Sequence, residues 1–193
     1  DDGGQDSDAL TIRVNRNLPI AAPAIYQTHA GITVDDQVED EWGNTPEMGI
    51  NNVTVGARTA DFQAQWKAMY DADNLYLLVE VNDEVLINDS GDGWYMDDVV
   101  EVFIDADNSS GGAYDGINDF QFGFRWDDDV IRIGNNSVNN SSGIVYAHYA
   151  TAVGYNLEVA FPWSLLGVSA SSVDYLGFDV AVDDDDNGGG GDD

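Results

Sequence analysis

The sequence predicts an all-β protein, an antiparallel β-sandwich that is jelly-roll-like. Three observations predict this fold class. Apolar and polar residues alternate in eight or nine short segments, which is the period of a strand with one buried face. Asp, Asn and Gly residues supply turns between these segments. Only residues 162–167 have the pattern of a helical turn, so helices are expected to contribute almost nothing to the core.

The expected elements follow in order along the chain. Residues 1–31 are expected to form a partly flexible N-terminal extension with a weak strand at 10–14. The sandwich is expected within residues 32–183, and residues 184–193 form an acidic, glycine-rich tail. A tight turn at 71–74 joins two strands as an antiparallel hairpin. The expected strands cover residues 62–70, 75–81, 98–105, 120–126, 130–133, 144–150, 155–161 and 176–182.

The net charge limits the partners of this chain. Its 193 residues carry a formal charge of −31, with thirty aspartates, seven glutamates and a single lysine, Lys67. Self-repulsion on this scale opposes folding unless high salt screens the charges or bound cations neutralise them. We therefore expect a halophilic or marine setting, or bound calcium. Neither nucleic acid nor an anionic membrane is expected as a partner.

The chain has enough apolar residues for a core and no cysteine. Hydrophobic residues make up 43% of the sequence, so one domain can bury a sizeable core. Without disulfides, an extracellular protein of this size is expected to be stabilised by metal. No run approaches the roughly 20 apolar residues that span a bilayer, so membrane insertion is not expected. We predict a secreted protein or one on the extracellular surface.

Residues 91–119 are the most informative stretch. The valines and the isoleucine within residues 100–104 alternate toward the core, which leaves Glu101 on the opposite face of its strand. Just before this strand, Trp94 and Tyr95 lie in a loop rich in Gly and Asp, where nothing in the local pattern buries them. An aromatic platform beside a carboxylate is therefore expected here.

Polar residues also occur on the strand faces that point away from the predicted core. If these strands are neighbours, they form one concave surface that can hydrogen-bond vicinal hydroxyls, while an aromatic ring stacks on a sugar. The alternative is that these residues are only the solvated face that any sandwich has. The residues concerned are Glu80, Glu101, Gln121, Arg125, Glu158 and Asp179.

The loop at residues 105–119 is predicted to bind calcium. Calcium takes six to eight oxygen ligands in flexible geometry, and glycines at 111, 112 and 116 allow the backbone to bend. The spacing does not match the twelve-residue helix-loop-helix calcium site, and among thirty aspartates a cluster also arises by chance. The candidate ligands are Asp105, Asp107, Asn108, Asp115 and Asp119.

No catalytic motif is found. Glu101 with Glu158 or Glu80 would make a carboxylate pair of the kind that hydrolyses glycosides, but so acidic a chain makes such pairs easy to find. His29 and His148 have no nucleophile or metal-ligand spacing around them, and neither a phosphate-binding loop nor an HExxH motif is present. We predict that the protein is not an enzyme.

Six collinear blocks of sequence stand out between residues 32 and 186. They are ITVD (32–35) with DEW (40–42), WKAMYD (66–71) with LYL (75–77), DVVEVFID (98–105), DFQF (119–122), YNLEVAFPW (155–163), and GFDV (177–180) with VDD (182–184). Together they resemble the carbohydrate-binding modules of family 9, which belong to the DOMON-like superfamily.

This resemblance implies a calcium-containing jelly roll that binds sugars, often at chain ends, as an accessory module of secreted polysaccharide-degrading enzymes. Members of this family hold a sugar between two tryptophans. The resemblance implies that Trp94 or Tyr95 takes the place of the first of them, and the spacing favours Tyr95. The second tryptophan and a final strand would follow the Asp/Gly segment, where this sequence stops at Asp193. Either this tryptophan pair is incomplete, or another residue takes the place of the second tryptophan, or the sequence is a piece of a longer one. Glu101 matches the strand glutamate that hydrogen-bonds the sugar. Of the polar positions after the matched Gln121, only Arg125 carries a suitable side chain.

We therefore predict a non-catalytic extracellular module that binds poly- or oligosaccharide through Trp94, Tyr95, Glu101, Gln121 and Arg125. A second hypothesis is a calcium-dependent structural or assembly domain of a cell surface or filament, in which sandwich edges mediate self-association. A third is a haem-binding electron-transfer domain, for which Met69 and Met96 would be the ligands to consider.

Overall fold

Eleven strands pair within the part of the chain that the structure describes. The structure is a computed structural model, and it describes residues 10–14, 24–35, 37–57, 60 and 62–187. The strands pair in the order β8-β7-β6-β11-β1-β2-β4-β5-β10-β9, and β3 also pairs with β4. Their bounds are β1 Leu10–Val14, β2 Ala24–Gln27, β3 Met48–Ile50, β4 Gln63–Tyr70, β5 Asn74–Asn82, β6 Val99–Asp105, β7 Asp119–Arg125, β8 Arg132–Ile133, β9 Val145–Ala150, β10 Gly154–Pro162 and β11 Tyr175–Asp183.

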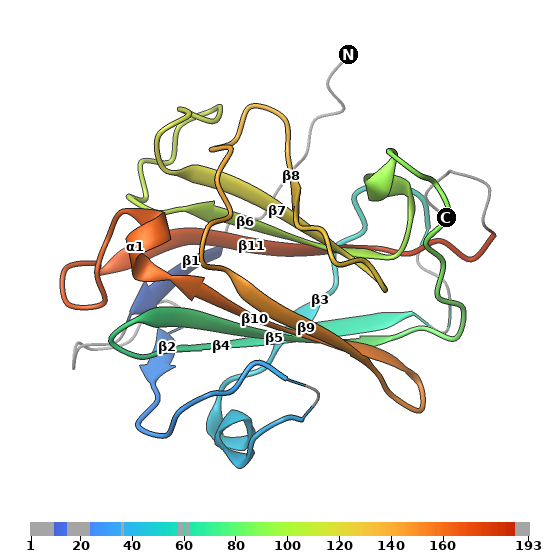
Figure 1. Ribbon diagram of the computed structural model, residues 1–193, viewed down its shortest axis with the longest axis horizontal. Helices are drawn as coiled ribbons and strands as arrows, with labels where there is room; N and C mark the ends of the chain where they lie inside the picture. Colours follow the sequence, from blue (N-terminus) through green and yellow to red (C-terminus); the bar gives the residue numbers. More distant parts are fainter. Residues whose placement is uncertain (1–9, 15–23, 36, 58–59, 61, 188–193) are drawn as a thin grey trace.

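The strands form two stacked layers (Figure 1). Sheet A contains β1, β6, β7, β8 and β11, and sheet B contains β2, β3, β4, β5, β9 and β10. Among the described strands, neighbours are antiparallel except in the pairs β1/β2 and β2/β4, through which sheet A continues into sheet B. The predicted all-β sandwich is confirmed.

The core lies between the two layers and follows the predicted alternation. In β5, Leu75 and Leu77 face inward and are fully buried. From sheet A, Phe120 and Phe122 stack with ring centroids 5.6 Å apart, and Phe122 reaches Phe161 of sheet B at 5.6 Å. Aromatic contacts across the two layers therefore hold the sheets together.

A second apolar cluster covers part of the outer face of sheet B. It is built around Trp42, which lies in the 3₁₀ turn η1 (Asp40–Asn44) and is only 1% exposed. In Figure 1 this turn lies outside sheet B, on the side away from sheet A. The second face of β5 is therefore apolar where η1 covers it. The cluster also contains Met69, Tyr76, Leu78 and Ala160.

The strand predictions agree with the structure except for two short elements. Each predicted strand is found within about two residues of its expected bounds, and the helical turn α1 (Trp163–Leu166) ends at Gly167, whose φ is 72°. β2 and β3 were not predicted, because four and three residues are too few to show alternation. Residues 1–31, expected to be an extension, contain β1 and β2 of the sandwich. No helix among the described residues is long and apolar enough to cross a membrane.

Candidate functional site

Glu101 and Gln121 meet on the outer face of sheet A. Glu101 lies on β6 and is paired in register with Gly123 of β7, two residues after Gln121. Gln121 Nε2 donates a hydrogen bond of 3.0 Å to Glu101 Oε2. Glu101 is 8% exposed, so most of its side chain is buried and this hydrogen bond fixes its carboxylate. The structure thus brings these two predicted residues together.

Trp94 packs closely against the backbone of β7 at Gly123. It belongs to the 3₁₀ turn η2 (Trp94–Met96), and a Cβ added at Gly123 would come within 2.3 Å of its ring. Only glycine at this position lets the indole approach the strand so closely. Because Gly123 pairs with Glu101, the indole lies beside that carboxylate.

Tyr95 stands at the edge of the same platform. Its ring centroid lies 5.9 Å from that of Trp94, at an angle of 84°, and its side chain is 53% exposed. Trp94 itself is half-buried. The two aromatic residues therefore form a corner, with the indole as the floor and the phenol ring as a projecting wall.

Arg125 is buried below this loop. It is 8% exposed, and its guanidinium forms ion pairs with Asp97 at 2.9 Å and Asp128 at 2.7 Å. Its Nη1 also donates to the carbonyl of Gly91 at 3.0 Å. Burial raises the pKa of the Asp97 carboxyl, but the hydrogen bonds from Arg125 and nearby backbone groups outweigh burial and lower the pKa overall. The guanidinium therefore holds the base of the loop that carries Trp94.

Two further residues border the site that the sequence pattern did not single out. The Tyr114 hydroxyl donates to Gln121 Oε1 at 3.0 Å, and burial, aided by the charge of Glu101, raises the pKa of Tyr114 to about 12. Arg132 of β8 pairs in register with Gly123, on the side opposite Glu101. Tyr114 could have been proposed from the sequence, because it is an aromatic residue within the acidic loop. Arg132 could not, because β8 is too short to show an alternating pattern.

The predicted polar face is divided between the two sheets. Asp179 of β11 lies on the outer face of sheet A, as Glu101 and Gln121 do. Glu80 and Glu158 lie on β5 and β10, which pair with each other in sheet B. The expectation of one concave surface is wrong, because the strands that carry these residues are not neighbours. Glu101 accordingly forms no carboxylate pair with either glutamate.

The predicted metal loop is held mainly by its own backbone. The side chain of Asp105 accepts hydrogen bonds from the amides of Ser109 and Ser110, at 3.1 and 2.9 Å. Asp107 Oδ1 accepts from Ser109 as well, and Asp119 Oδ2 accepts from the amide of Asp115 at 2.6 Å. Asn108 takes a φ of 53° at the turn. Asp115 Oδ1 in turn accepts from the amides of Ile117 and Asn118, so all four predicted carboxylates already accept amides from the same loop.

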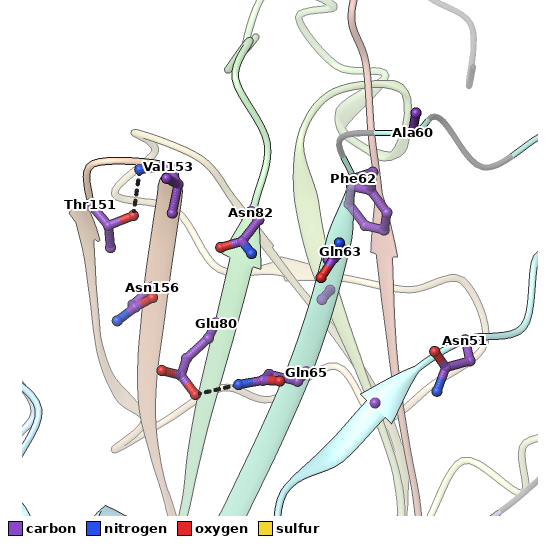
Figure 2. Close-up of a pocket in the computed structure, with 12 residues that line it drawn as sticks. Asn51, Ala60, Phe62, Gln63, Gln65, Glu80, Asn82, Thr151, Val153 and Asn156 are labelled. Atoms are coloured by element: carbon purple, nitrogen blue, oxygen red, sulfur yellow. Dashed lines mark hydrogen bonds between the residues drawn. The ribbon is translucent and has the colours of Figure 1, made fainter.

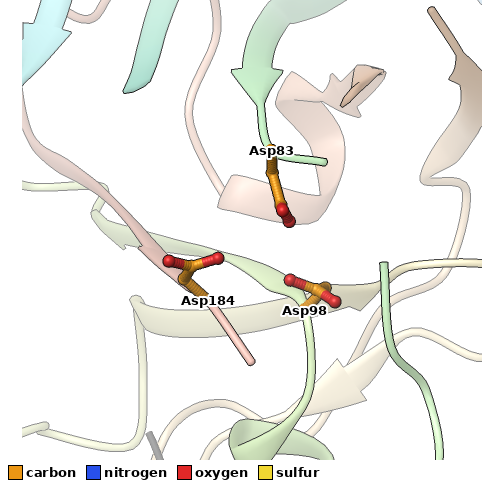
Figure 3. Close-up of side chains that lie close together, drawn as sticks. All are labelled: Asp83, Asp98 and Asp184. Carbon is orange, nitrogen blue, oxygen red and sulfur yellow. The ribbon is translucent and has the colours of Figure 1, made fainter. Parts of the chain in front are cut away.

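Tighter groups of carboxylates occur where β5, β6 and β11 meet. Asp83 follows β5, Asp98 precedes β6 and Asp184 follows β11, and one oxygen of each lies within 4.8 Å of the other two. Figure 3 shows the three side chains pointing toward a common point. Burial, together with the nearby charge of Asp83, raises the pKa of Asp98 to about 8. A second group of this kind contains Asp89, Asp97 and Asp185.

Comparison with known proteins identifies the family. Residues 34–193 match the family described as "Carbohydrate family 9 binding domain-like". The chain is 32% identical over 158 residues to Endo-1,4-beta-xylanase A of Thermotoga neapolitana, covering 78% of this chain and 14% of that protein. It is 33% identical over 162 residues to Endo-1,4-beta-xylanase A of Thermoanaerobacterium saccharolyticum, covering 84% of this chain and 13% of that protein. The chain thus spans about one seventh of the length of these relatives.

Solved structures share the fold. A carbohydrate-binding module of family 9 from Caldicellulosiruptor kristjanssonii in complex with cellotriose superimposes with a TM-score of 0.70 at 22% identity, covering 84% of this chain and 77% of that chain. Its complex with glucose gives a TM-score of 0.69 at 22% identity and covers 84% of this chain and 79% of that chain. The match over residues 34–193 shows that the chain belongs to family 9 of the carbohydrate-binding modules, and it is a non-catalytic sugar-binding module, as its sequence predicts.

Proposed function

We propose that the outer face of sheet A binds the end of a neutral sugar chain, with the Trp94 indole as its stacking platform. The observation that carries this proposal is the indole held against Gly123, beside Glu101 in the next strand. A sugar ring has an apolar face that can stack on an indole and hydroxyls that a fixed carboxylate can bind. The cellotriose and glucose complexes of the related modules support a glucose-containing ligand.

Each residue of the site has a proposed role. Glu101 and Gln121 bind adjacent hydroxyls, and their mutual hydrogen bond of 3.0 Å positions both groups before the sugar arrives. Tyr95 forms a wall beside the ring. Arg125 acts as a positioning residue, because its guanidinium is already bonded to Asp97, Asp128 and Gly91. Arg132 pairs in register with Gly123, and its side chain is 23% exposed against 9% for Arg125. Its guanidinium is therefore the more accessible of the two.

We also propose that calcium stabilises the module at the group of Asp83, Asp98 and Asp184. The donor set fits this ion, because calcium prefers several carboxylate oxygens in flexible geometry. Bringing three carboxylates this close is unfavourable without a cation, and the raised pKa of Asp98 is consistent with that. In the second group, Asp97 already pairs with Arg125, so it has less need of a cation. The turn at residues 105–119 is the other candidate calcium site.

The proposed setting is outside the cell, as an accessory to an enzyme that degrades polysaccharide. The relatives named above are xylanases, and the chain matches only 13–14% of their length, which is the share expected of one module in a larger protein. A binding module of this kind keeps an attached catalytic domain close to its insoluble substrate.

Titration calorimetry with cellotriose tests the sheet A site. We expect Trp94→Ala to weaken binding at least about tenfold, which corresponds to about 1.4 kcal/mol. Tyr26→Ala is the matched control, because Tyr26 is also an exposed aromatic, at 43%, but lies on β2 away from the site. Equal affinities for Trp94→Ala and the unmodified protein would exclude the indole as the platform.

A further inference from the structure

The outer face of sheet B carries a groove that the site on sheet A does not use. Beyond the part covered by Trp42, the groove has a volume of about 620 Å³ and opens between β3, β4, β5 and β10. Figure 2 shows its side chains standing on these strands. Five of the lining residues carry side-chain amides, and we call the feature the amide groove. They are Asn51, Gln63, Gln65, Asn82 and Asn156.

The register of sheet B places polar side chains in rows across this groove. The first row contains Gln65 on β4, Glu80 on β5 and Asn156 on β10, with Gly49 of β3 at one end. Tyr149 of β9, which pairs with Asn156, continues this row beyond the groove. A parallel row two residues further along contains Gln63 and Asn82, which pair directly. The four strands that border the groove, spaced about 4.8 Å apart, span about 14 Å, so one row is long enough to contact more than one sugar unit.

The amide groove is nearly neutral on a strongly acidic protein. None of its twelve lining residues is an aspartate, although 30 of the 193 residues of the chain are. Its one carboxylate, Glu80, lies 3.1 Å from Nζ of Lys67, the single lysine of the sequence. If this face only contacted water, we would expect it to carry aspartates, as the chain as a whole does. The local neutrality indicates a neutral, polar occupant rather than a cation or a polyanion.

The side chains of the groove can recognise hydroxyl groups. Gln65 Nε2 donates to Glu80 Oε2 at 3.1 Å, and Asn156 Nδ2 donates to the Tyr149 hydroxyl at 3.2 Å, so these groups are held in place. Among the residues that the structure describes, the side-chain amides of Gln63 and Asn82 make no hydrogen bond to the protein. Each amide offers two donors and an acceptor, which matches a hydroxyl that both donates and accepts.

The walls of the groove are partly apolar. Phe62 lines one end, and Val153 lines the turn between β9 and β10 at the other side (Figure 2). Val153 is 59% exposed, which an apolar contact from a ligand would cover. Such a mixture of amides and small apolar surfaces suits the two faces of a pyranose ring.

We propose that the amide groove is a second carbohydrate site, which binds an internal stretch of a neutral, linear polysaccharide. It is independent of the sheet A site, because the two lie on opposite outer faces of the sandwich. One site would bind a chain end and the other the side of a chain. Occupation of both would increase retention on a polysaccharide surface through effective concentration, without any new contact.

The test uses cellohexaose and xylohexaose with the full chain. In the Trp94→Ala background, which disables the sheet A site, we expect at least one hexasaccharide to bind still and to shift the side-chain amide proton resonances of Gln63 and Asn82. Adding Gln65→Ala and Asn156→Ala is expected to weaken this residual binding about tenfold. Asn135→Ala with Asn139→Ala is the matched control, because both amides are exposed and lie outside the groove.

Three results would overturn the proposal. The first is an absence of shifts at Gln63 and Asn82 in the unmodified protein with either hexasaccharide, a measurement that does not depend on any variant folding. The second is unchanged residual affinity after the groove substitutions. The third is preferential binding of hexagalacturonate, an anionic chain. Failure of the sheet A proposal would look different, because cellotriose would then bind Trp94→Ala as it binds the unmodified protein while the groove resonances still responded.

Discussion

The outer faces of the two sheets have the same strand pattern and very different surfaces. On sheet A, the turn η2 places Trp94 over Gly123 and leaves a compact site floored by one indole. On sheet B, the segment around η1 covers one part of the face with Trp42, and another part is an open groove lined by amides. The alternation of each strand fixes which side chains point outward, but the loops decide which of them are covered, stacked or left open.

The difference concerns energy as well as shape. Removing an exposed aromatic residue from the face of sheet A should affect binding, because its contacts are made with a ligand. Removing a buried one from the face of sheet B should affect folding, because its contacts are made with the protein itself. The following predictions separate these two outcomes.

The largest effect is expected for Trp42→Ala. Trp42 is 1% exposed and contacts the apolar part of the sheet B face, so its removal should lower the free energy of unfolding by about 3–5 kcal/mol. Cellotriose binding at sheet A should not change in the folded protein. Denaturant unfolding measures the first quantity, with Tyr26→Ala as the control for an exposed aromatic. A loss below about 1 kcal/mol would show that this covering segment does not seal the face.

Chelation should have the next largest effect, because the proposed calcium group joins the two sheets. Asp83 comes from sheet B, whereas Asp98 and Asp184 flank strands of sheet A. Calcium at a hundred times its dissociation constant should raise the free energy of unfolding by about 2.7 kcal/mol. Melting curves with and without chelator measure this difference. In Asp98→Asn the calcium effect should shrink sharply, and without calcium this variant should melt above the unmodified protein.

Asp115→Asn is the control for calcium, because it alters the other acidic turn. If Asp115→Asn abolishes the calcium effect and Asp98→Asn preserves it, the ion binds at residues 105–119. An identical melting curve with and without chelator would contradict both placements.

A smaller effect is expected from the protonation of Glu158, which is buried on the covered part of the sheet B face. Burial raises the pKa of Glu158 to about 7 from 4.5, although the amide of Asp35 donates to it at 3.3 Å. A raised pKa means that the folded state favours the protonated form, so this contribution is complete below about pH 4.5 and is lost as pH rises through about 7.

The variant Glu158→Gln isolates this contribution. It should be more stable than the unmodified protein by about 1–3 kcal/mol at pH 8 and nearly equal to it at pH 4. Unfolding curves at both pH values, with Glu80→Gln as the exposed-face control, measure the difference. Parallel pH profiles of Glu158→Gln and the unmodified protein would contradict the assignment.

The smallest expected effect is specific to sheet A. Gly123→Ala would place a Cβ within 2.3 Å of the indole, so Trp94 must move away from β7. We expect about tenfold weaker cellotriose binding, or about 1.4 kcal/mol, with little change in the unfolding free energy. Gly31→Ala is the control, because a Cβ there meets no atom within 4 Å. Unchanged affinity in Gly123→Ala would show that the sugar does not depend on this position of the ring.

The strands were predictable because their information is local. Alternation alone identified β5 and placed Glu101 on the outer face of β6, and the Gly/Asp-rich loop before β6 indicated that Trp94 and Tyr95 are not core residues. Short elements such as β3 have too few residues to show a period. The sequence could not indicate whether strands carrying Glu80 and Glu101 were neighbours, since pairing depends on the path of the whole chain.

The acidic groups show a second limit of the sequence. Asp83, Asp98 and Asp184 are far apart in the sequence, so their spacing does not predict that they cluster in the fold. The turn at residues 105–119 was predicted as a calcium site because its acidic residues are close in sequence. Arg125 is a similar case. Its position on a strand predicts an outward guanidinium, and only the fold shows that Asp97 and Asp128 enclose it.

The chain of hydrogen bonds from Tyr114 through Gln121 to Glu101 has a direction. Tyr114 donates to the amide oxygen, and the amide nitrogen donates to the carboxylate. A half-turn of the amide would place its oxygen against the Glu101 carboxylate, which has no proton to donate, so this orientation of the amide is the favoured one. A surface with its donors and acceptors fixed in this way distinguishes a ligand from the same ligand turned end for end. The sheet A site should therefore tell the reducing end of a glycan from the non-reducing end.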